Sequence, residues 1–117
     1  MSTQRYLAIY LGSLSAREKA EAAGTVTEAT AAAGMAAWGE WVAKYRDAIV
    51  DTGSPLGKTK RVSATGIADI TNMAVAYVIV EADSHEAAAA MFREHPHFTI
   101  FPGDSVEVMQ CLPMPGA

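Results

Sequence analysis

The chain has 117 residues, and its length, charge and composition exclude several classes of protein. Half of the residues are hydrophobic and 19% are charged, which is typical of one globular domain spanning residues 1–117. A net charge of -4 argues against binding to nucleic acid, because phosphates require clustered Lys and Arg. No apolar run reaches the ~20 residues that span a bilayer, and the N-terminus lacks a signal-peptide pattern. We therefore expect a cytoplasmic protein that does not bind membranes.

The first predicted element is a strand over residues 5–11. Its apolar side chains fall on both faces. Tyr6, Ala8 and Tyr10 lie on one face, and Leu7, Ile9 and Leu11 lie on the other. A strand that is apolar on both sides is expected in the centre of a sheet, covered from both directions.

Two capping boxes, starting at Ser15 and Thr25, predict the beginnings of a short helical turn and of a longer helix. Gly53 is expected to end the longer helix. Its predicted apolar stripe, at spacings of three and four, consists of Met35, Trp38, Val42, Tyr45 and Ile49. Trp41 lies off this stripe, which makes it a candidate for a pocket wall or a dimer contact.

Residues 58–63 form a predicted polar strand, and residues 66–72 a hairpin connection to the apolar strand 74–82. Ser84 is expected to cap a second helix that Pro96 ends, because proline has no N–H to donate. His95 would then lie at the C-terminal end of that helix, where the dipole favours its protonated form. Gly103 and Asp104 turn the chain into a last strand over residues 105–112. Cys111 is interpreted as a half-buried residue of that strand.

The order of elements, β-α-β-β-α-β, predicts a ferredoxin-like α+β fold with an antiparallel sheet. The first and third strands would be central, and the charged strand 58–63 would form an edge. Both helices can cover only one face of this sheet. We therefore expect a homodimer in which the uncovered faces pack together, as in a dimeric α/β-barrel.

The second half of the chain resembles the YCII-related family, including its DGPF-like branch. The resemblance is carried by the segment VIVEADS at residues 78–84, by a proline after an alanine-rich helix, and by GDSVEV at residues 103–108. It implies a dimeric α/β-barrel and, for some members, a small enzyme with a His and an Asp in a pocket beside the sheet. The chain departs from the family at three places: a first-helix histidine is replaced by the region of Ala37 and Trp38, an acid before the proline by His95, and the DGPF signature by residues 66–70.

The stretch HPHF at residues 95–98 carries the strongest candidates for chemistry. We predict His97 as a general acid/base or a hydrogen-bond donor, with Asp69 or Asp104 as its partner, because loops host such groups. Two histidines around a proline point in different directions, and no third ligand follows at a metal-binding spacing. We therefore expect no metal and no cofactor, and assign His95 to the helix end.

Aromatic side chains could line a pocket for a small organic ligand. The candidates are Tyr6, Tyr10, Trp38, Trp41, Tyr45 and Phe98, together with His95. The alternative interpretation places Trp38 and Tyr45 in the core between helix and sheet.

Two classes of function remain open. One is a small cofactor-free enzyme of isomerase, lyase or dehalogenase type, which a cleft holding His97 beside a buried carboxylate would favour. The other is a non-catalytic dimeric module that binds a small molecule or a protein, which a site filled by Trp38 and Met91 would favour. A cofactor-free monooxygenase is a third interpretation, without a specific motif.

Overall fold

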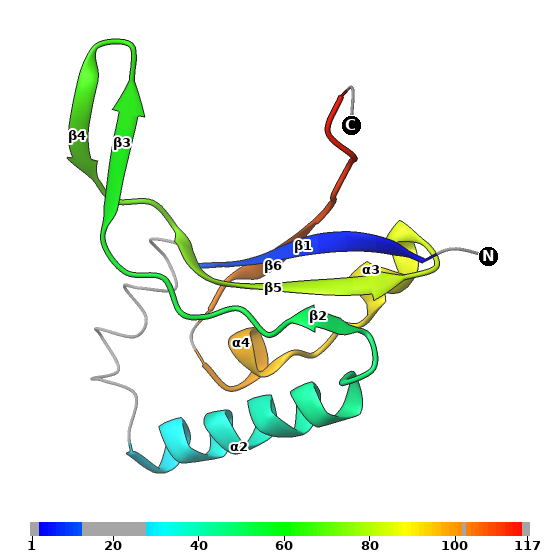
Figure 1. Cartoon of the computed structure of the whole chain (residues 1–117). Coiled ribbons are helices and arrows are strands. Elements are labelled where there is room, and N and C mark those ends of the chain that lie inside the picture. Colours follow the sequence, from blue (N-terminus) through cyan, green and yellow to red (C-terminus); the bar gives the residue numbers. More distant parts are fainter. Residues whose placement is uncertain (1–2, 13–27, 102, 116–117) are drawn as a thin grey trace.

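Four strands form one antiparallel sheet in the computed structural model, which describes residues 3–12, 28–101 and 103–115 (Figure 1). The strand order is β2-β5-β1-β6. The bounds are β1 Gln4–Leu11, β2 Ile49–Asp51, β5 Ala74–Ala82 and β6 Ser105–Gln110. The two strands with apolar residues on both faces, β1 and β5, are central, as predicted. The fold is the predicted ferredoxin-like α+β arrangement.

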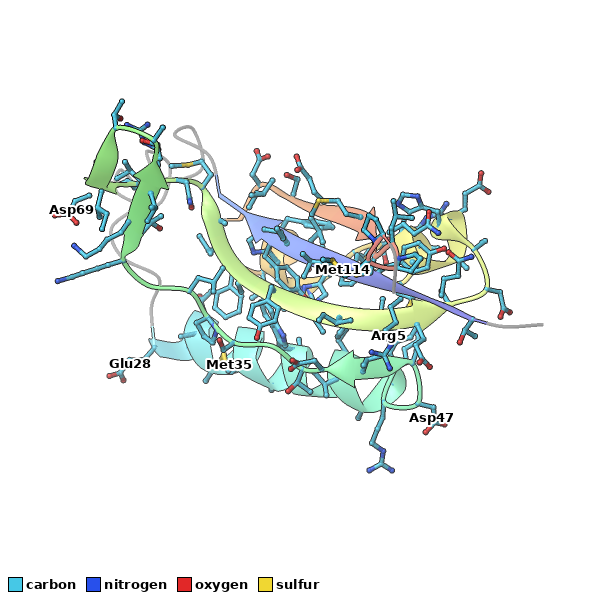
Figure 2. All side chains as sticks on the ribbon, turned by 45° about the horizontal axis from the view of Figure 1, so that its top comes forward. Arg5, Glu28, Met35, Asp47, Asp69 and Met114 are labelled. Carbon is cyan, nitrogen blue, oxygen red and sulfur yellow. The ribbon has the colours of Figure 1, made fainter. Side chains whose placement is uncertain are left out.

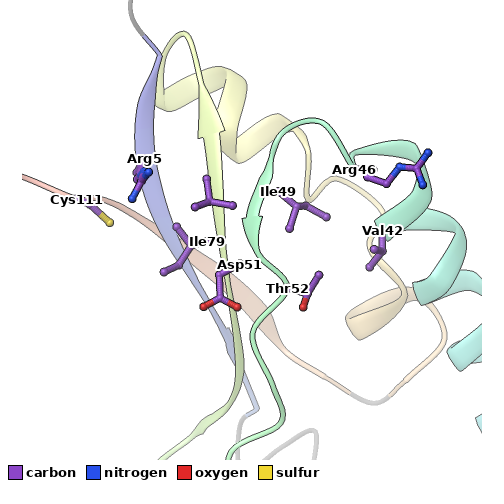
Figure 3. A pocket seen from close by; sticks show the side chains of 9 residues that line it. Arg5, Val42, Arg46, Ile49, Asp51, Thr52, Ile79 and Cys111 are labelled. Atoms are coloured by element: carbon purple, nitrogen blue, oxygen red, sulfur yellow. The ribbon is translucent and has the colours of Figure 1, made fainter.

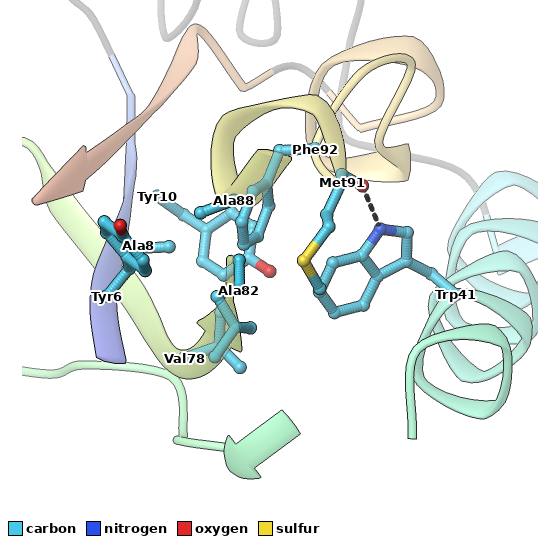
Figure 4. Close-up of a cluster of buried hydrophobic side chains, with 10 residues drawn as sticks. Tyr6, Ala8, Tyr10, Trp41, Val78, Ala82, Ala88, Met91 and Phe92 are labelled. Carbon is cyan, nitrogen blue, oxygen red and sulfur yellow. Dashed lines mark hydrogen bonds between the residues drawn. The ribbon is translucent and has the colours of Figure 1, made fainter. Parts of the chain in front are cut away.

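Three helices cover one face of the sheet: α2 (Glu28–Lys44), α3 (His85–Ala90) and α4 (Pro96–Thr99). The side chains of β1 alternate, so that Tyr6, Ala8 and Tyr10 are buried under the helices and their neighbours face the other way. Figure 4 shows the resulting core, in which these side chains meet Val78, Ala88 and Phe92 and their neighbours. Burying a side chain such as Val80 completely stabilises the fold by about 1.5–3 kcal/mol.

The prediction for the edge strand is wrong. The edge beside β5 is β2, and the charged segment lies in β3 (Thr59–Ser63) instead, which pairs with β4 (Gly66–Ile70) in a separate two-stranded hairpin. Every residue from 60 to 69 is exposed. The segment has too few apolar residues to bury a face on the helices, so it leaves the sheet and stands beyond its end (Figure 1).

The long helix ends earlier than predicted. It stops at Lys44, a turn follows in which the N–H of Ile49 donates to the carbonyl of Tyr45, and the β-branched residues Ile49 and Val50 enter β2. The predicted apolar stripe is therefore correct only in its middle. Met35 is 64% exposed, whereas Trp41, which was placed off the stripe, is 8% exposed and belongs to the core.

The second helix also differs from the prediction. Ser84 caps α3 as expected, accepting from the N–H of Ala87, but α3 ends at Ala90. Glu94 then adopts a left-handed backbone with φ of 54°, and Pro96 begins α4 instead of ending α3. Proline suits the first helical turn because the N–H that it lacks has no partner there. His95 is accordingly the N-cap of α4, and its assignment to a helix C-terminus is wrong.

The last strand is shorter than predicted, since β6 ends at Gln110. Cys111 follows it and is exposed, so the interpretation as a half-buried strand residue is wrong. The two predicted capping boxes begin at Ser15 and Thr25, outside the described residues. No described helix is long and apolar enough to cross a membrane.

Candidate functional site

A cavity of about 380 Å³ opens between α2, the two central strands and the loop that follows β2. Its walls are largely aromatic and aliphatic, and none of the described residues that line it is an acid, a lysine or an arginine. The inner wall is formed by Tyr10, Trp38, Trp41, Val78, His97 and Phe101. Such a lining, apolar with a few polar atoms, suits a small uncharged or weakly charged organic molecule.

His97 is the titratable imidazole in this wall. Its side chain is 5% exposed, and its Nε2 lies 2.8 Å from the carbonyl oxygen of Leu11 at the end of β1. A carbonyl can only accept, so Nε2 carries a proton and donates it to this bond. In the neutral ring Nδ1 is then the atom with the free lone pair. His97 therefore has a fixed orientation and one nitrogen able to take up a proton.

Gly103 holds the His97 ring in place by close approach. A Cβ at Gly103 would lie 2.3 Å from Cε1 and 2.5 Å from Nδ1 of His97, so a side chain there would displace the ring. The N–H of Gly103 also donates to the carbonyl of His97 at 2.9 Å. The absence of a side chain at position 103 is thus a condition for the observed geometry.

His95 lies behind the cavity wall and is completely enclosed, with 0% of its surface exposed. The ring centroids of Trp38, Trp41 and Tyr10 lie 4.5, 4.8 and 4.9 Å from its own. Its Nδ1 accepts from the backbone N–H of His97 at 3.0 Å, which places the proton of the neutral ring on Nε2. Burial, and next the charge of His97, lower the pKa of His95 to about 4. His95 is therefore neutral near pH 7.

Tyr10 connects this enclosed histidine to the cavity. Its hydroxyl oxygen lies 3.2 Å from Nε2 of His95 and accepts the proton that this nitrogen carries. The hydroxyl proton of Tyr10 is then free to be donated elsewhere. Burial raises the pKa of the Tyr10 phenol, so the group stays protonated. The sequence suggests Tyr10, together with Tyr6, as a pocket-lining residue of the first strand, but it gives no indication of the bond between Tyr10 and His95.

The structure does not bring the predicted carboxylates to His97. Asp69 lies on β4, 83% exposed, and forms an ion pair with Lys60 across the hairpin. The carboxylate of Asp104 accepts from the hydroxyl of Ser105, and its backbone N–H donates to the Leu11 carbonyl that also holds His97. Within the described part of the chain, no hydrogen bond joins either acid to the imidazole.

The predicted pocket aromatics divide into two groups. Trp38 and Trp41 line the cavity, and the indole N–H of Trp41 is held by the carbonyl of Met91 at 2.7 Å (Figure 4). Tyr6 is not part of the lining; it is buried and packs on the ring of His85 at 5.2 Å. Tyr45 packs against Trp41 and is not part of the cavity lining, and Phe98 is 38% exposed.

A second hollow, of about 750 Å³, lies at the β2 edge of the sheet (Figure 3). Arg5, Ile79 and Cys111 border it on one side. Val42 of α2 and Arg46 in the turn after α2 border it on the other. It contains none of the described histidines. Two of its polar residues have local partners: Asp51 accepts from the N–H of Gly53, and Arg5 pairs with Glu81 at 3.9 Å. The cavity at His97 is therefore the better candidate for chemistry.

A metal site was not expected from the sequence. Among the residues that the structure describes, no group of three or more His, Cys, Asp or Glu side chains is placed to hold an ion. The two imidazoles of the HPHF stretch are committed through one nitrogen each to backbone groups, as described above.

No known protein family has a sequence profile that matches the chain, and no curated protein matches it. A solved structure has a similar fold, that of 5-chloro-2-hydroxyhydroquinone dehydrochlorinase (TftG) from Burkholderia phenoliruptrix AC1100, in complex with 2,5-dihydroxybenzoquinone. The TM-score is 0.54 at 14% sequence identity, over 92% of this chain and 93% of that chain. At this identity the likeness establishes the fold. The chain has the same fold as this structure.

Proposed function

We propose that the chain is a small cofactor-free enzyme that transfers protons on a small organic molecule bound in the aromatic cavity. The observation that supports this proposal most is the position of His97. Its buried imidazole lies in the cavity wall and is oriented by its bond to the carbonyl of Leu11 at 2.8 Å. A histidine is suited to this role because its pKa lies near physiological pH. The reaction type we propose is an isomerisation, an elimination or a dehalogenation.

In this proposal Nδ1 of His97 removes a proton from the bound molecule. The carbonyl of Leu11 accepts from Nε2–H throughout, and it stabilises the imidazolium that forms. The hydroxyl of Tyr10, whose oxygen accepts from His95, donates to a substrate oxygen on which negative charge develops. The proton on His97 then returns to another atom of the product, or leaves with the departing group. His95 acts as a positioning residue for Tyr10.

Two resemblances support this choice of chemistry. The similarly folded TftG is a dehydrochlorinase seen with a quinone, and the aromatic walls of the present cavity would stack on a flat ring of that kind. The segments at residues 78–84 and 103–108 resemble the YCII-related family and its DGPF-like branch, some of whose members are thought to be small enzymes. We propose membership of that family on these segments.

We also propose that the protein acts as a homodimer. The face of the sheet opposite the helices, here called the outer face, carries a half-buried apolar centre that includes Leu7, Ile9, Tyr77 and Ile79. In the described chain no helix covers this face (Figure 1). A second copy packed face to face would bury it.

The chain provides a direct test of binding, because its two tryptophans both line the cavity. Titration of 2,5-dihydroxybenzoquinone should quench the tryptophan fluorescence, and substituted hydroquinones should then be assayed for turnover. For any substrate that is turned over, His97→Asn should lower kcat by about 10²–10⁴-fold. His85→Asn is the matched control, since His85 is exposed on α3 and bonds only to the carbonyl of Val108 among the described residues. Equal activities of the two variants would reject the proposed role of His97.

A second candidate function is a non-catalytic module that binds the same kind of molecule. It is favoured by the positions of Asp69 and Asp104, neither of which reaches His97 in the described chain. The cavity remains open, with Trp38 as its wall and Met91 beneath Trp41, so a ligand can enter under either interpretation. Quenching without turnover by wild type would support the module.

A further inference from the structure

The most exposed large apolar side chains of the described residues belong to two short segments. Val62 and Ile67, 73% and 70% exposed, lie on the hairpin β3–β4, here called the arm (residues 58–70). Leu112 and Met114, 73% and 75% exposed, lie on the segment after β6, here called the tail (residues 111–115). Water-exposed apolar side chains gathered on projections mark a surface that another molecule covers.

Both segments stand on the same side of the sheet. Figure 1 shows the arm beyond one end of β5 and the tail rising from the other end of the sheet, on the side opposite α2 and α4. Figure 2 places Met114 over the sheet. The arm and the tail therefore flank the outer face, here also called the floor, whose centre is apolar.

The arm has one apolar side. Val62 pairs with Ile67 across the hairpin, so the two side chains are neighbours on one face, with the Lys60–Asp69 ion pair beside them. Arg61 and Ala68 pair on the opposite face. A two-stranded hairpin that stands alone is only marginally stable in water, and a partner for its apolar face would fix it.

Charge favours a second copy of this chain as that partner. The arm has three basic residues and one acidic residue, hence a charge of +2, whereas the remainder of the chain has a charge of -6. The floor itself carries Glu81 and Glu107, which lie opposite Arg5 and Ile9 in the strand pairing. A basic arm is therefore attracted to the acidic body of another copy and not to that of another arm.

We infer that the arm and the tail form a clamp that holds the second subunit of the dimer. Val62 and Ile67 of each copy pack on the outer face of the other, with the cations of the arm near Glu107, while Leu112 and Met114 close the opposite end. The contact is isologous, so each copy both supplies and receives an arm. This inference rests on the proposed homodimer. It assigns much of the affinity between the two subunits to two segments outside the sheet.

The test is the dimer dissociation constant of the full chain, measured by sedimentation equilibrium at two salt concentrations. The arm variant V62D/I67D should raise this constant by at least ~100-fold, because four charges enter an apolar contact per dimer. The tail variant L112D/M114D should raise it by ~10-fold or more, and added salt should weaken the wild-type dimer. Ala68→Asp puts one such charge on the opposite face of the arm; it lowers the arm's charge without entering the apolar contact, and it should raise the constant far less than V62D/I67D does. Circular dichroism reports whether each variant folds.

The outcomes separate the clamp from the dimer itself. If V62D/I67D dimerises like wild type while Ile79→Asp on the floor gives a folded monomer, the dimer stands and the clamp is wrong. If wild type is monomeric at ~100 μM, both are wrong. Hydrogen exchange gives a second readout: backbone amides of the arm should be protected in concentrated samples and exchange rapidly after dilution. A monomer whose arm binds a DNA duplex would assign the basic arm to nucleic acid and overturn the inference.

Discussion

His95 and His97 are two residues apart, yet they lie in two regions with opposite properties. His95 is sealed in a box of aromatic rings, with both ring nitrogens bonded and its pKa lowered to about 4. His97 is also buried, but its ring borders an open cavity and only one of its nitrogens makes a hydrogen bond among the described residues. The two histidines are therefore buried to a similar degree but differ in their hydrogen bonds. One nitrogen of His97 has no hydrogen-bond partner among the described residues, whereas both nitrogens of His95 have one.

Removing each imidazole gives the largest effect and tests this contrast directly. We expect His95→Ala to lower the free energy of unfolding by about 3–5 kcal/mol, because it opens a hole in the core and leaves the N–H of His97 without its acceptor. His97→Ala, at the cavity wall, should cost about 1–2 kcal/mol. Urea denaturation at pH 7.5 measures both. Equal losses would mean that both histidines are structural in the same degree.

The lowered pKa of His95 makes stability depend on pH. The unfolded chain binds a proton at His95 near pH 6.5, and the folded chain binds it only near pH 4. The stabilisation is therefore complete above pH 6.5 and is lost as the pH falls toward 4, by on the order of 3 kcal/mol. His95→Gln should remove this part of the pH dependence. His85→Gln should retain it, and a wild-type profile that matches His95→Gln would show that His95 titrates normally.

A substitution at Gly103 tests whether the orientation of His97 at the cavity matters for binding. Gly103→Ala should push the ring of His97 out of position, lowering the free energy of unfolding by about 1–3 kcal/mol and weakening the binding of 2,5-dihydroxybenzoquinone. Gly57→Ala is the control, because a Cβ there would meet no atom within 4 Å. Unchanged fluorescence quenching by the probe in Gly103→Ala would show that binding does not require the observed His97 orientation.

Two glycines of α2 also differ in that one is enclosed and the other is open to solvent. Substitutions there should change the free energy of unfolding least. A Cβ at Gly34 would lie 2.4 Å from the ring of Phe101, which lines the cavity, whereas a Cβ at Gly39 would meet nothing within 4 Å. Gly39→Ala should stabilise the protein by about 0.5–1 kcal/mol through helix propensity. Gly34→Ala should destabilise it. Thermal unfolding of both variants checks the signs, which would be equal if Phe101 moved away without cost.

The central part of the fold could be predicted from the sequence because its pattern has a single interpretation. Strands β1 and β5 have eight and nine residues and, apart from Gln4, Arg5 and Glu81, are apolar on both faces, as expected of central strands. The edge strand β2 has three residues, and Ile49 fits the helical spacing of Tyr45 as well as a strand. A short β-branched segment after a helix is therefore read as more helix. Its real partner, Val80, is remote in sequence and invisible to a local pattern.

The site was predicted in part for a similar reason. The choice of His97 over His95 for chemistry follows from its predicted place in a loop. That placement is wrong, because His97 lies in α4, and its role remains a proposal. Pro96 can end one helix or begin the next. The left-handed backbone at Glu94 separates the two helices, but glutamate is not a residue type that indicates such a conformation. The partners of His97 were sought among nearby acids. The structure provides instead a backbone carbonyl, which every residue has and which no motif can single out.

That carbonyl of Leu11 has a consequence for how the protein folds. It accepts hydrogen bonds from the imidazole of His97 and from the backbone N–H of Asp104. His97 is 86 residues away from Leu11 in the sequence. Contacts of such long range form late, because the entropy of closing the intervening loop opposes them until other strands have paired. In a partly folded chain the aromatic residues can therefore be packed while the imidazole of His97 is not yet oriented. Catalytic competence, if His97 provides it, should return in refolding kinetics only with the slowest phase that restores the β1–β6 pairing.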